Sequence, residues 1–236
     1  MLSPVYRSVK RPFLSKLYSG SEVWCPVCSH SFKSWLNNQE DGECPYCGSG
    51  CRQRMLCLYL TDIYSYDKNP VNLLFFAPSW GLEQWFCQRS EFRCTTTDLA
   101  APGVDFHADI TNLLVADSSY DLIVCSHVLE HVPDDAKAIS EMFRILRQGG
   151  NALIQVPLNN SSEQTDEDPS ITDPSERARR FGQFDHVRLY GNDIIERLKA
   201  PGFKVEAVRL MQNFDSETSK RLGLWDDTVF VCEKIE

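Results

Sequence analysis

The chain has 236 residues, of which 42% are hydrophobic and 24% charged, and its net charge is −9. These values are those of an ordinary globular protein that can bury a core without disulfides. The sequence has no apolar stretch as long as a membrane span and no secretory leader, so we expect the cytoplasm.

The charge is distributed unevenly. Residues 1–60 contain seven Lys/Arg and four Asp/Glu, whereas the remainder contains 17 and 29. A body this acidic is a poor match for a nucleic-acid backbone, so nucleic acid is not an expected partner. We expect the basic segment 1–20 to pack against the acidic body. The alternatives are a transit peptide and a short amphipathic helix that makes peripheral contact with an anionic membrane.

Residues 21–57 predict a small zinc-ribbon-like module. Two Cys-x2-Cys pairs, separated by fifteen residues, give four thiolates that can converge on one tetrahedral zinc ion. With four protein ligands the metal would be structural. Cys51 and His30 lie nearby as alternative ligands. The four predicted ligands are Cys25, Cys28, Cys44 and Cys47.

From about residue 70, strands alternate with helices, which predicts a parallel sheet in an α/β, doubly wound domain covering 58–236. We expect helices over Asp134–Arg147, stopped by Gly149-Gly150, and over Asn192–Ala200. The mostly polar segment 158–190 is long enough to be a functional lid or disordered. The predicted strands are Asn72–Ala77, Phe92–Thr97, Val104–Phe106, Tyr120–Ser126, Ala152–Pro157, Phe203–Leu210 and Thr228–Lys234.

The first predicted strand runs into a turn of small residues. Ala77, Ser79 and Gly81 would let the backbone approach a ligand closely at the carboxyl edge of the sheet. Asp98 ends the next strand about twenty residues later, where a carboxylate can accept hydrogen bonds from a ribose.

The central third of the domain carries a longer pattern, Tyr120-Asp-Leu-Ile-Val-Cys-Ser-His-Val-Leu-Glu-His-Val-Pro-Asp134, followed by a helix and by Leu146-Arg-Gln-Gly-Gly-Asn-Ala-Leu-Ile. This pattern resembles class I S-adenosylmethionine (SAM)-dependent methyltransferases. Phe76-Ala-Pro78, both Cys pairs and the segment Gly182–Gly191 resemble a methyltransferase type 11-like subgroup of that family.

The resemblance implies a Rossmann-like sheet of seven strands with an antiparallel last strand, and SAM across the ends of three strands. It also implies a glycine-rich turn at the first strand, an acid that binds the ribose, a site for the adenine, and residues on the reacting side of the cofactor. In this sequence the implied cofactor-binding residues are Ala77, Pro78, Ser79, Gly81, Asp98, Leu99, Asp109, Ile110, Ser126 and His127.

Two sets of side chains are candidates for chemistry on the methyl acceptor. In the first, His186 is a candidate base and Arg188 a candidate clamp for a substrate anion, with Asp185 beside them and His127 at the cofactor. The alternative is that His186, Arg188 and Tyr190 pin the lid structurally. The second set, His127, Glu130 and His131, resembles the Glu-x-x-Glu-His of ubiquinone-pathway O-methyltransferases. That resemblance implies a second divalent metal; the alternative is a structural role.

The expected function is therefore methyl transfer from SAM to an oxygen, nitrogen or sulfur atom of a small molecule. One alternative is an RNA or protein methyltransferase that docks through the zinc module. Another is a non-catalytic protein of the same fold, because Phe75, Ala77 and Ser79 replace the acid and two glycines usual in the first motif.

Overall fold

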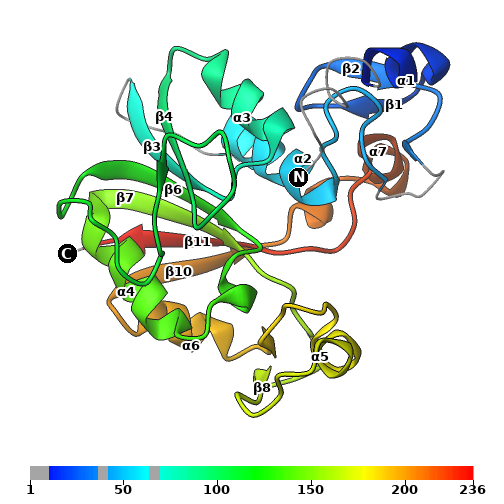
Figure 1. Ribbon diagram of the computed structural model, residues 1–236. Helices are drawn as coiled ribbons and strands as arrows, with labels where there is room; N and C mark the ends of the chain where they lie inside the picture. Colours follow the sequence, from blue (N-terminus) through cyan, green and yellow to red (C-terminus); the bar gives the residue numbers. More distant parts are fainter. Residues whose placement is uncertain (1–10, 37–41, 64–69, 236) are drawn as a thin grey trace. The chain divides into compact units, whose positions relative to one another are not determined.

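A seven-stranded sheet organises the protein (Figure 1). The structure is a computed structural model that describes residues 11–36, 42–63 and 70–235, so half of the basic segment 1–20 lies outside the described residues. The strand order is β10-β11-β7-β6-β3-β4-β5. The strands are β3 (Val71–Phe76), β4 (Phe92–Asp98), β5 (Phe106–His107), β6 (Tyr120–Ser126), β7 (Leu146–Gln155), β10 (Phe203–Val208) and β11 (Val229–Lys234).

The strand directions confirm the predicted fold class. β3 and β6, β6 and β7, and β4 and β5 pair in parallel, whereas β11 runs antiparallel to β7. Each of the seven predicted strands is present. Phe76 pairs with Cys125, so β3 and β6 end nearly level at one edge of the sheet. Parallel sheets bind ligands at this carboxyl edge.

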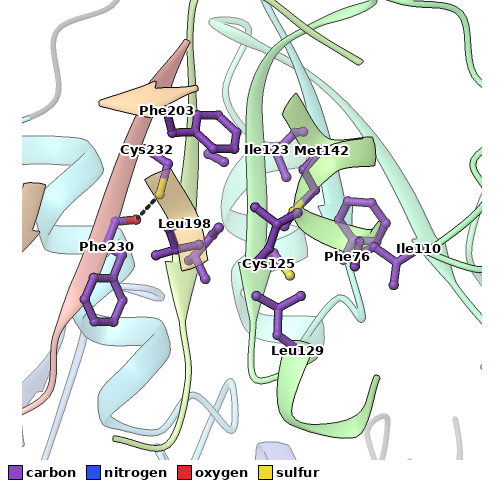
Figure 2. Packing of buried hydrophobic residues seen from close by; sticks show 14 of the residues in the cluster. Phe76, Ile110, Ile123, Cys125, Leu129, Met142, Leu198, Phe203, Phe230 and Cys232 are labelled. Atoms are coloured by element: carbon purple, nitrogen blue, oxygen red, sulfur yellow. Dashed lines mark hydrogen bonds between the residues drawn. The ribbon is translucent and has the colours of Figure 1, made fainter. Parts of the chain in front are cut away.

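Two helices, α4 (Asp135–Ile145) and α6 (Ile194–Lys199), lie side by side along the sheet (Figure 1). The Asp134 carboxylate caps α4 by accepting a hydrogen bond from Lys137 N. Helical spacing brings the apolar side chains of α4 to one face, and Figure 2 shows Met142 among the side chains of the sheet. This cluster is a continuous core beneath the carboxyl edge.

The predicted helix stop at Gly149-Gly150 is wrong. The helix ends at Ile145, and β7 begins at the next residue and contains both glycines. A Cβ atom on Gly150 would lie 2.8 Å from Arg147 O and 2.9 Å from Asp121 O. Gly150 therefore permits close backbone approach at an irregularity in the pairing of β6 with β7, where glycine is favoured in strands.

The segment between β7 and α6 is folded, which corrects the expectation of a long loop. It contains α5 (Pro174–Phe181) and an antiparallel pair of short strands, β8 (Asp166–Glu167) and β9 (Arg188–Leu189). Asp173 caps α5 by accepting from Glu176 N, and the left-handed Gly182 ends it. A bridge between Leu158 and Tyr190 holds the two ends of the segment together, and the pairing of β8 with β9 holds its interior.

The chain divides into two compact units. The larger contains most of the sheet with α4, α5 and α6. The other combines the described residues up to 70 with residues 78–94 and 209–229. Its elements are α1 (Arg11–Leu17), β1 (Ser19–Cys25), β2 (His30–Phe32), α2 (Cys51–Leu58), a π-helical turn (Tyr59–Ile63), α3 (Trp80–Cys87), a 3-10 turn (Leu210–Asn213) and α7 (Ser216–Leu222).

In the smaller unit, segments from the two halves of the chain pack together. α7 lies against β1 (Figure 1). Arg54 is fully buried, stacks on the Trp35 ring at 4.1 Å, and donates hydrogen bonds to Gly42 O, Ser49 O and Gly223 O. A single guanidinium thus joins the cysteine-rich segment to the residues after α7. Among the described residues, no helix is long and apolar enough to cross a membrane.

Candidate functional site

The four cysteines predicted as zinc ligands converge on one point and form what we call the four-cysteine cluster. Their sulfur atoms all lie within 4.8 Å of one another. The Sγ atoms of Cys25 and Cys47 are 3.7 Å apart, and those of Cys28 and Cys44 are 3.6 Å apart. A tetrahedron with Zn–S bonds of about 2.3 Å has sulfur separations of about 3.8 Å. The spacing fits that geometry.

Side chains and backbone groups around the four-cysteine cluster hold its cysteines in place. Ser49 Oγ lies 2.7 Å from the Cys47 Sγ, within hydrogen-bonding distance. The adjacent Gly48 has a positive φ of 74°, and a Cβ there would meet the Arg11 guanidinium at 2.5 Å. Arg11 donates to Cys44 O and pairs with Glu43. Contacts of this kind around a metal site hold its ligands in position.

Neither alternative ligand is part of the cluster. Cys51 Sγ accepts a hydrogen bond from Trp225 N. The His30 ring lies outward, with Nδ1 donating to Cys28 O at 2.6 Å. Burial raises the pKa of a further thiol, Cys57, to about 12, so it stays protonated at neutral pH.

Gly81 contacts the zinc-ribbon-like module. A Cβ at this position would lie 2.9 Å from Cys47 O and 3.4 Å from Cys47 Sγ. Because Gly81 has no side chain, the turn that carries the second Cys-x2-Cys pair can approach α3 closely. Ser79, two residues earlier, is the N-cap residue of this helix.

A cavity of about 640 Å³ opens at the carboxyl edge of the sheet. Its walls come from the ends of β3, β4 and β6 and from the segments that follow them. Six of the residues predicted to bind the cofactor line it, and they are Ala77, Asp98, Leu99, Asp109, Ile110 and His127. Pro78, Ser79, Gly81 and Ser126 are not among the lining residues. Ser126 Oγ instead donates to Gln155 Oε1 within the sheet.

The two acids in this wall are held differently. Asp98 Oδ1 accepts hydrogen bonds from Ala100 N and Ala101 N, which fixes the turn after β4. Asp109 Oδ1 accepts from the backbone and hydroxyl of Thr111. These bonds from Thr111 lower the pKa of Asp109, so its carboxyl group is ionised at neutral pH. Both acids are placed to accept hydrogen bonds from a ligand.

Sequence reasoning missed several lining residues. Thr111 was detectable as the partner of Asp109, because a hydroxyl two residues after Asp is common in such turns. Val128 and the loop after His131 follow β6 directly, and this position alone could have suggested them. The lining residues not assigned to the cofactor site from the sequence are Phe76, Ala108, Thr111, Val128, His131, Val132, Pro133, Asp134 and Asp185.

The side chain of Arg188 is buried and binds groups inside the protein. Its side chain is 5% exposed, and it donates to the carbonyls of Leu129, Val132 and Pro133 and to Glu167. A guanidinium with these partners has little capacity left for a substrate anion. The geometry therefore favours the structural alternative, in which Arg188 fixes the loop after the 3-10 turn Leu129–His131.

Tyr190 is also structural in its contacts. Its hydroxyl donates to Asp135 Oδ2 at 2.9 Å, and the side chain is fully buried. Burial and the neighbouring carboxylate of Asp135 raise the pKa of Tyr190 well above its ordinary value. The phenol is therefore a permanent hydrogen-bond donor that ties the end of β9 to α4.

Four ionisable side chains gather next to the cavity. Glu130 is fully buried, and His127 Nδ1 lies 3.0 Å from its Oε1. His186 Nε2 lies 4.0 Å from the same oxygen, and the His131 and His186 rings meet edge to face at 4.8 Å. Of the three predicted second-metal ligands, Glu130 and His131 have ligand atoms within 4.8 Å of each other and of His186; this set does not include His127.

Comparison with known proteins shows what part of the chain is similar to. Residues 47–154 match the family described as "Methyltransferase domain". Over 106 residues the chain is 33% identical to a probable S-adenosylmethionine-dependent methyltransferase of Mycolicibacterium smegmatis. The aligned part is 44% of this chain and only 37% of that protein, so the chain spans little more than a third of its curated relative.

Solved structures share the fold at low identity. The YcgJ protein of Bacillus subtilis superposes with a TM-score of 0.52 at 14% identity, covering 78% of this chain and 98% of that one. Phosphoethanolamine N-methyltransferase 2 of Haemonchus contortus, bound to S-adenosyl-L-methionine, gives 0.53 at 14%, covering 79% and 53%. The [4+2]-cyclase SpnF gives 0.50 at 13%, covering 97% and 92%.

These findings confirm the resemblance to class I SAM-dependent methyltransferases. The chain has their Rossmann-like seven-stranded sheet, and its central segment matches their domain family. A likeness at 11–16% identity shows the fold alone, because the same fold occurs in a [4+2]-cyclase.

Proposed function

We propose that the protein transfers a methyl group from SAM to an oxygen, nitrogen or sulfur atom of a small molecule. The observation that carries the proposal is the cavity at the carboxyl edge, where Asp98 and Asp109 meet the left-handed turns at Ala77 and His127. Its volume of about 640 Å³ lies within the usual range for small-molecule sites.

The chain's residues would bind and orient the cofactor. Asp98 would accept hydrogen bonds from the ribose hydroxyls through the oxygen that the turn amides leave available. Asp109 would accept from the adenine amine. Leu99 is 71% exposed beside them, and a bound nucleoside would cover its apolar surface.

Methyl transfer needs little covalent help from the protein. SAM supplies an activated methyl group on a sulfonium, and the acceptor must approach it in line. Positioning and water exclusion then provide much of the acceleration. His127 and Asp185 line the cavity and are the candidates to orient the acceptor or to take its proton.

We also propose that the four-cysteine cluster of the module 21–57 holds a structural zinc ion. Four thiolates would close the coordination shell, leaving no position for a substrate. The net charge of −9 favours a small molecule over RNA as the methyl acceptor.

Two measurements test the proposal on the zinc-loaded protein. Calorimetry with SAM and S-adenosylhomocysteine should show saturable binding, since both share the adenosyl group. Radiolabelled methyl-SAM should then label a low-molecular-weight fraction of a cell extract. Label found only in RNA or protein would reject the small-molecule acceptor, and absence of cofactor binding would reject the activity itself.

A further inference from the structure

We propose a second metal site in the wall of the cavity, in which Glu130, His131 and His186 bind one divalent transition-metal ion. These side chains come from two segments distant in sequence, the 3-10 turn after β6 and the segment before β9. Their ligand atoms lie within 4.8 Å of one another.

Glu130 provides the first argument. Its side chain is 0% exposed, and neither carboxylate oxygen has a hydrogen-bond donor among the residues that the structure describes. A buried carboxylate without donors is costly, because it loses its hydration without replacement. His127 Nδ1 lies 3.0 Å away but outside hydrogen-bond geometry. A cation between Glu130 and its neighbours would remove this cost.

His186 provides the second argument. Its Nδ1 lies 2.9 Å from Phe181 O, and since a carbonyl only accepts, Nδ1 carries the hydrogen. In the neutral ring, Nε2 then presents a lone pair toward Glu130 Oε1 at 4.0 Å. Two acceptors facing each other at this distance are too far apart for a hydrogen bond but can share a metal ion. A ligating histidine usually donates its other N–H to a carbonyl or carboxylate.

His131 provides the third ligand. Its Nδ1 lies 3.4 Å from Asp185 Oδ2, and its ring meets that of His186 edge to face. If the Asp185 carboxylate binds Nδ1, Nε2 is left as the ligand atom. His131 also lines the cavity, so it connects the metal site to the ligand space.

The two segments are fixed independently of any metal. Val187 N donates to Glu130 O at 2.9 Å, and Arg188 binds the carbonyls of Leu129 and Val132. The residue after His186 and the backbone of Glu130 are thus held together. The protein therefore presents the three ligands without having to fold around the ion.

The donor set selects the class of ion. Two imidazoles and one carboxylate suit zinc and divalent iron or cobalt, whereas magnesium prefers oxygen ligands only. Three protein ligands leave a coordination position open. In a role that rests on the proposed function, the ion would bind the acceptor oxygen or nitrogen and lower its pKa, which aids deprotonation before methyl transfer.

Cobalt(II) is the probe for the experiment, used on protein whose four-cysteine cluster already holds zinc. Titration should add one ion with visible d–d bands and without the thiolate charge-transfer absorption that the four-cysteine cluster would give. Glu130→Gln and His131→Gln should each weaken cobalt binding about tenfold or more, because each removes a ligand. The matched control is His107→Gln, an exposed imidazole outside the site.

The outcomes separate this proposal from the proposed function. Wild-type protein that binds S-adenosylhomocysteine but no cobalt overturns the metal site and leaves the methyltransferase proposal intact. Cobalt bound with unchanged affinity in folded Glu130→Gln and His131→Gln also overturns it, and a proton or His127 then neutralises Glu130. Cobalt binding without any cofactor binding would reject the methyltransferase proposal only.

Discussion

Ala77 and His127 occupy equivalent positions at the ends of the neighbouring parallel strands β3 and β6. Both have a left-handed backbone, with φ of 46° and 55°. The backbone N–H of Ala77 donates to Thr97 O in β4 at 2.9 Å, and that of His127 donates to Gln155 O in β7 at 2.8 Å. Both residues line the cavity. The chain therefore turns sharply at the same level in two adjacent strands, and the cavity occupies the space that results.

Ala77→Val should destabilise the protein by about 1–3 kcal/mol, because a β-branched residue is strained at positive φ. Ala77→Gly should instead be neutral or slightly stabilising at this position. Chemical denaturation of the two variants against wild type checks the pair. Equal stability of the valine and glycine variants would show that the left-handed turn is not present in solution.

Asp98→Asn should weaken SAM binding by about tenfold, the worth of a hydrogen bond to a charged acceptor. Asparagine keeps an oxygen for the amides of Ala100 and Ala101, so the turn after β4 should persist. Calorimetry gives the affinity, with the exposed Asp226→Asn as a control. Unchanged affinity would remove Asp98 from the cofactor site.

Cys25→Ser or Cys44→Ser should abolish zinc binding and destabilise the smaller unit, since the metal contributes directly to folding. Elemental analysis reports the metal, and thermal unfolding reports the stability. The exposed Cys87→Ser should retain both. Full zinc content in the first two variants would contradict four-thiolate coordination.

Arg188→Ala should cost at least about 3 kcal/mol, because three carbonyls and Glu167 lose a buried charged partner. Since Val132 and Pro133 line the cavity, cofactor affinity should fall with stability. Arg179→Ala, whose side chain is 75% exposed, should change neither. A stable Arg188→Ala protein with intact cofactor affinity and lost turnover would instead favour the substrate-clamp alternative.

Acid should loosen the segment from β8 to β9. Hydrogen bonds from Arg197, and then from Arg188, lower the pKa of Glu167 against the opposing effect of burial. Because the folded pKa is depressed, this stabilisation is complete above the ordinary pKa of about 4.3 and is lost as pH falls through the folded value. The Tm difference between wild type and Glu167→Gln should therefore shrink below about pH 4. A difference that is constant from pH 7 to pH 3 would contradict this assignment.

The sequence predicted the sheet well because buried parallel strands read as apolar runs, as in the segment that forms β6. It failed at Gly149-Gly150, where Gly149 has a left-handed backbone and Gly150 lies against backbone oxygens of its own strand and of β6. Periodicity also missed α5, because a short polar helix between Asp173 and Gly182 has almost no buried face.

The same contrast holds for the candidate site. Asp98 ends β4, about twenty residues after the first turn, so spacing was enough to predict its role, whereas the role of Asp109 was implied only by the family resemblance. The partners of Arg188 could not be inferred, because its acceptors lie 55 to 59 residues earlier in the chain. The proximity of His186 to Glu130 was hidden for the same reason. Contacts of this length depend on the tertiary fold.

The hydrogen bond from Arg54 to Gly223 O can form only late in the synthesis of the chain. The residues of the four-cysteine cluster leave the ribosome early, but α7 and the carbonyl that Arg54 binds emerge about 170 residues later. The guanidinium of Arg54 therefore stays hydrated until nearly the whole chain has been synthesised. Early metal capture would protect the thiols of the cluster during that delay.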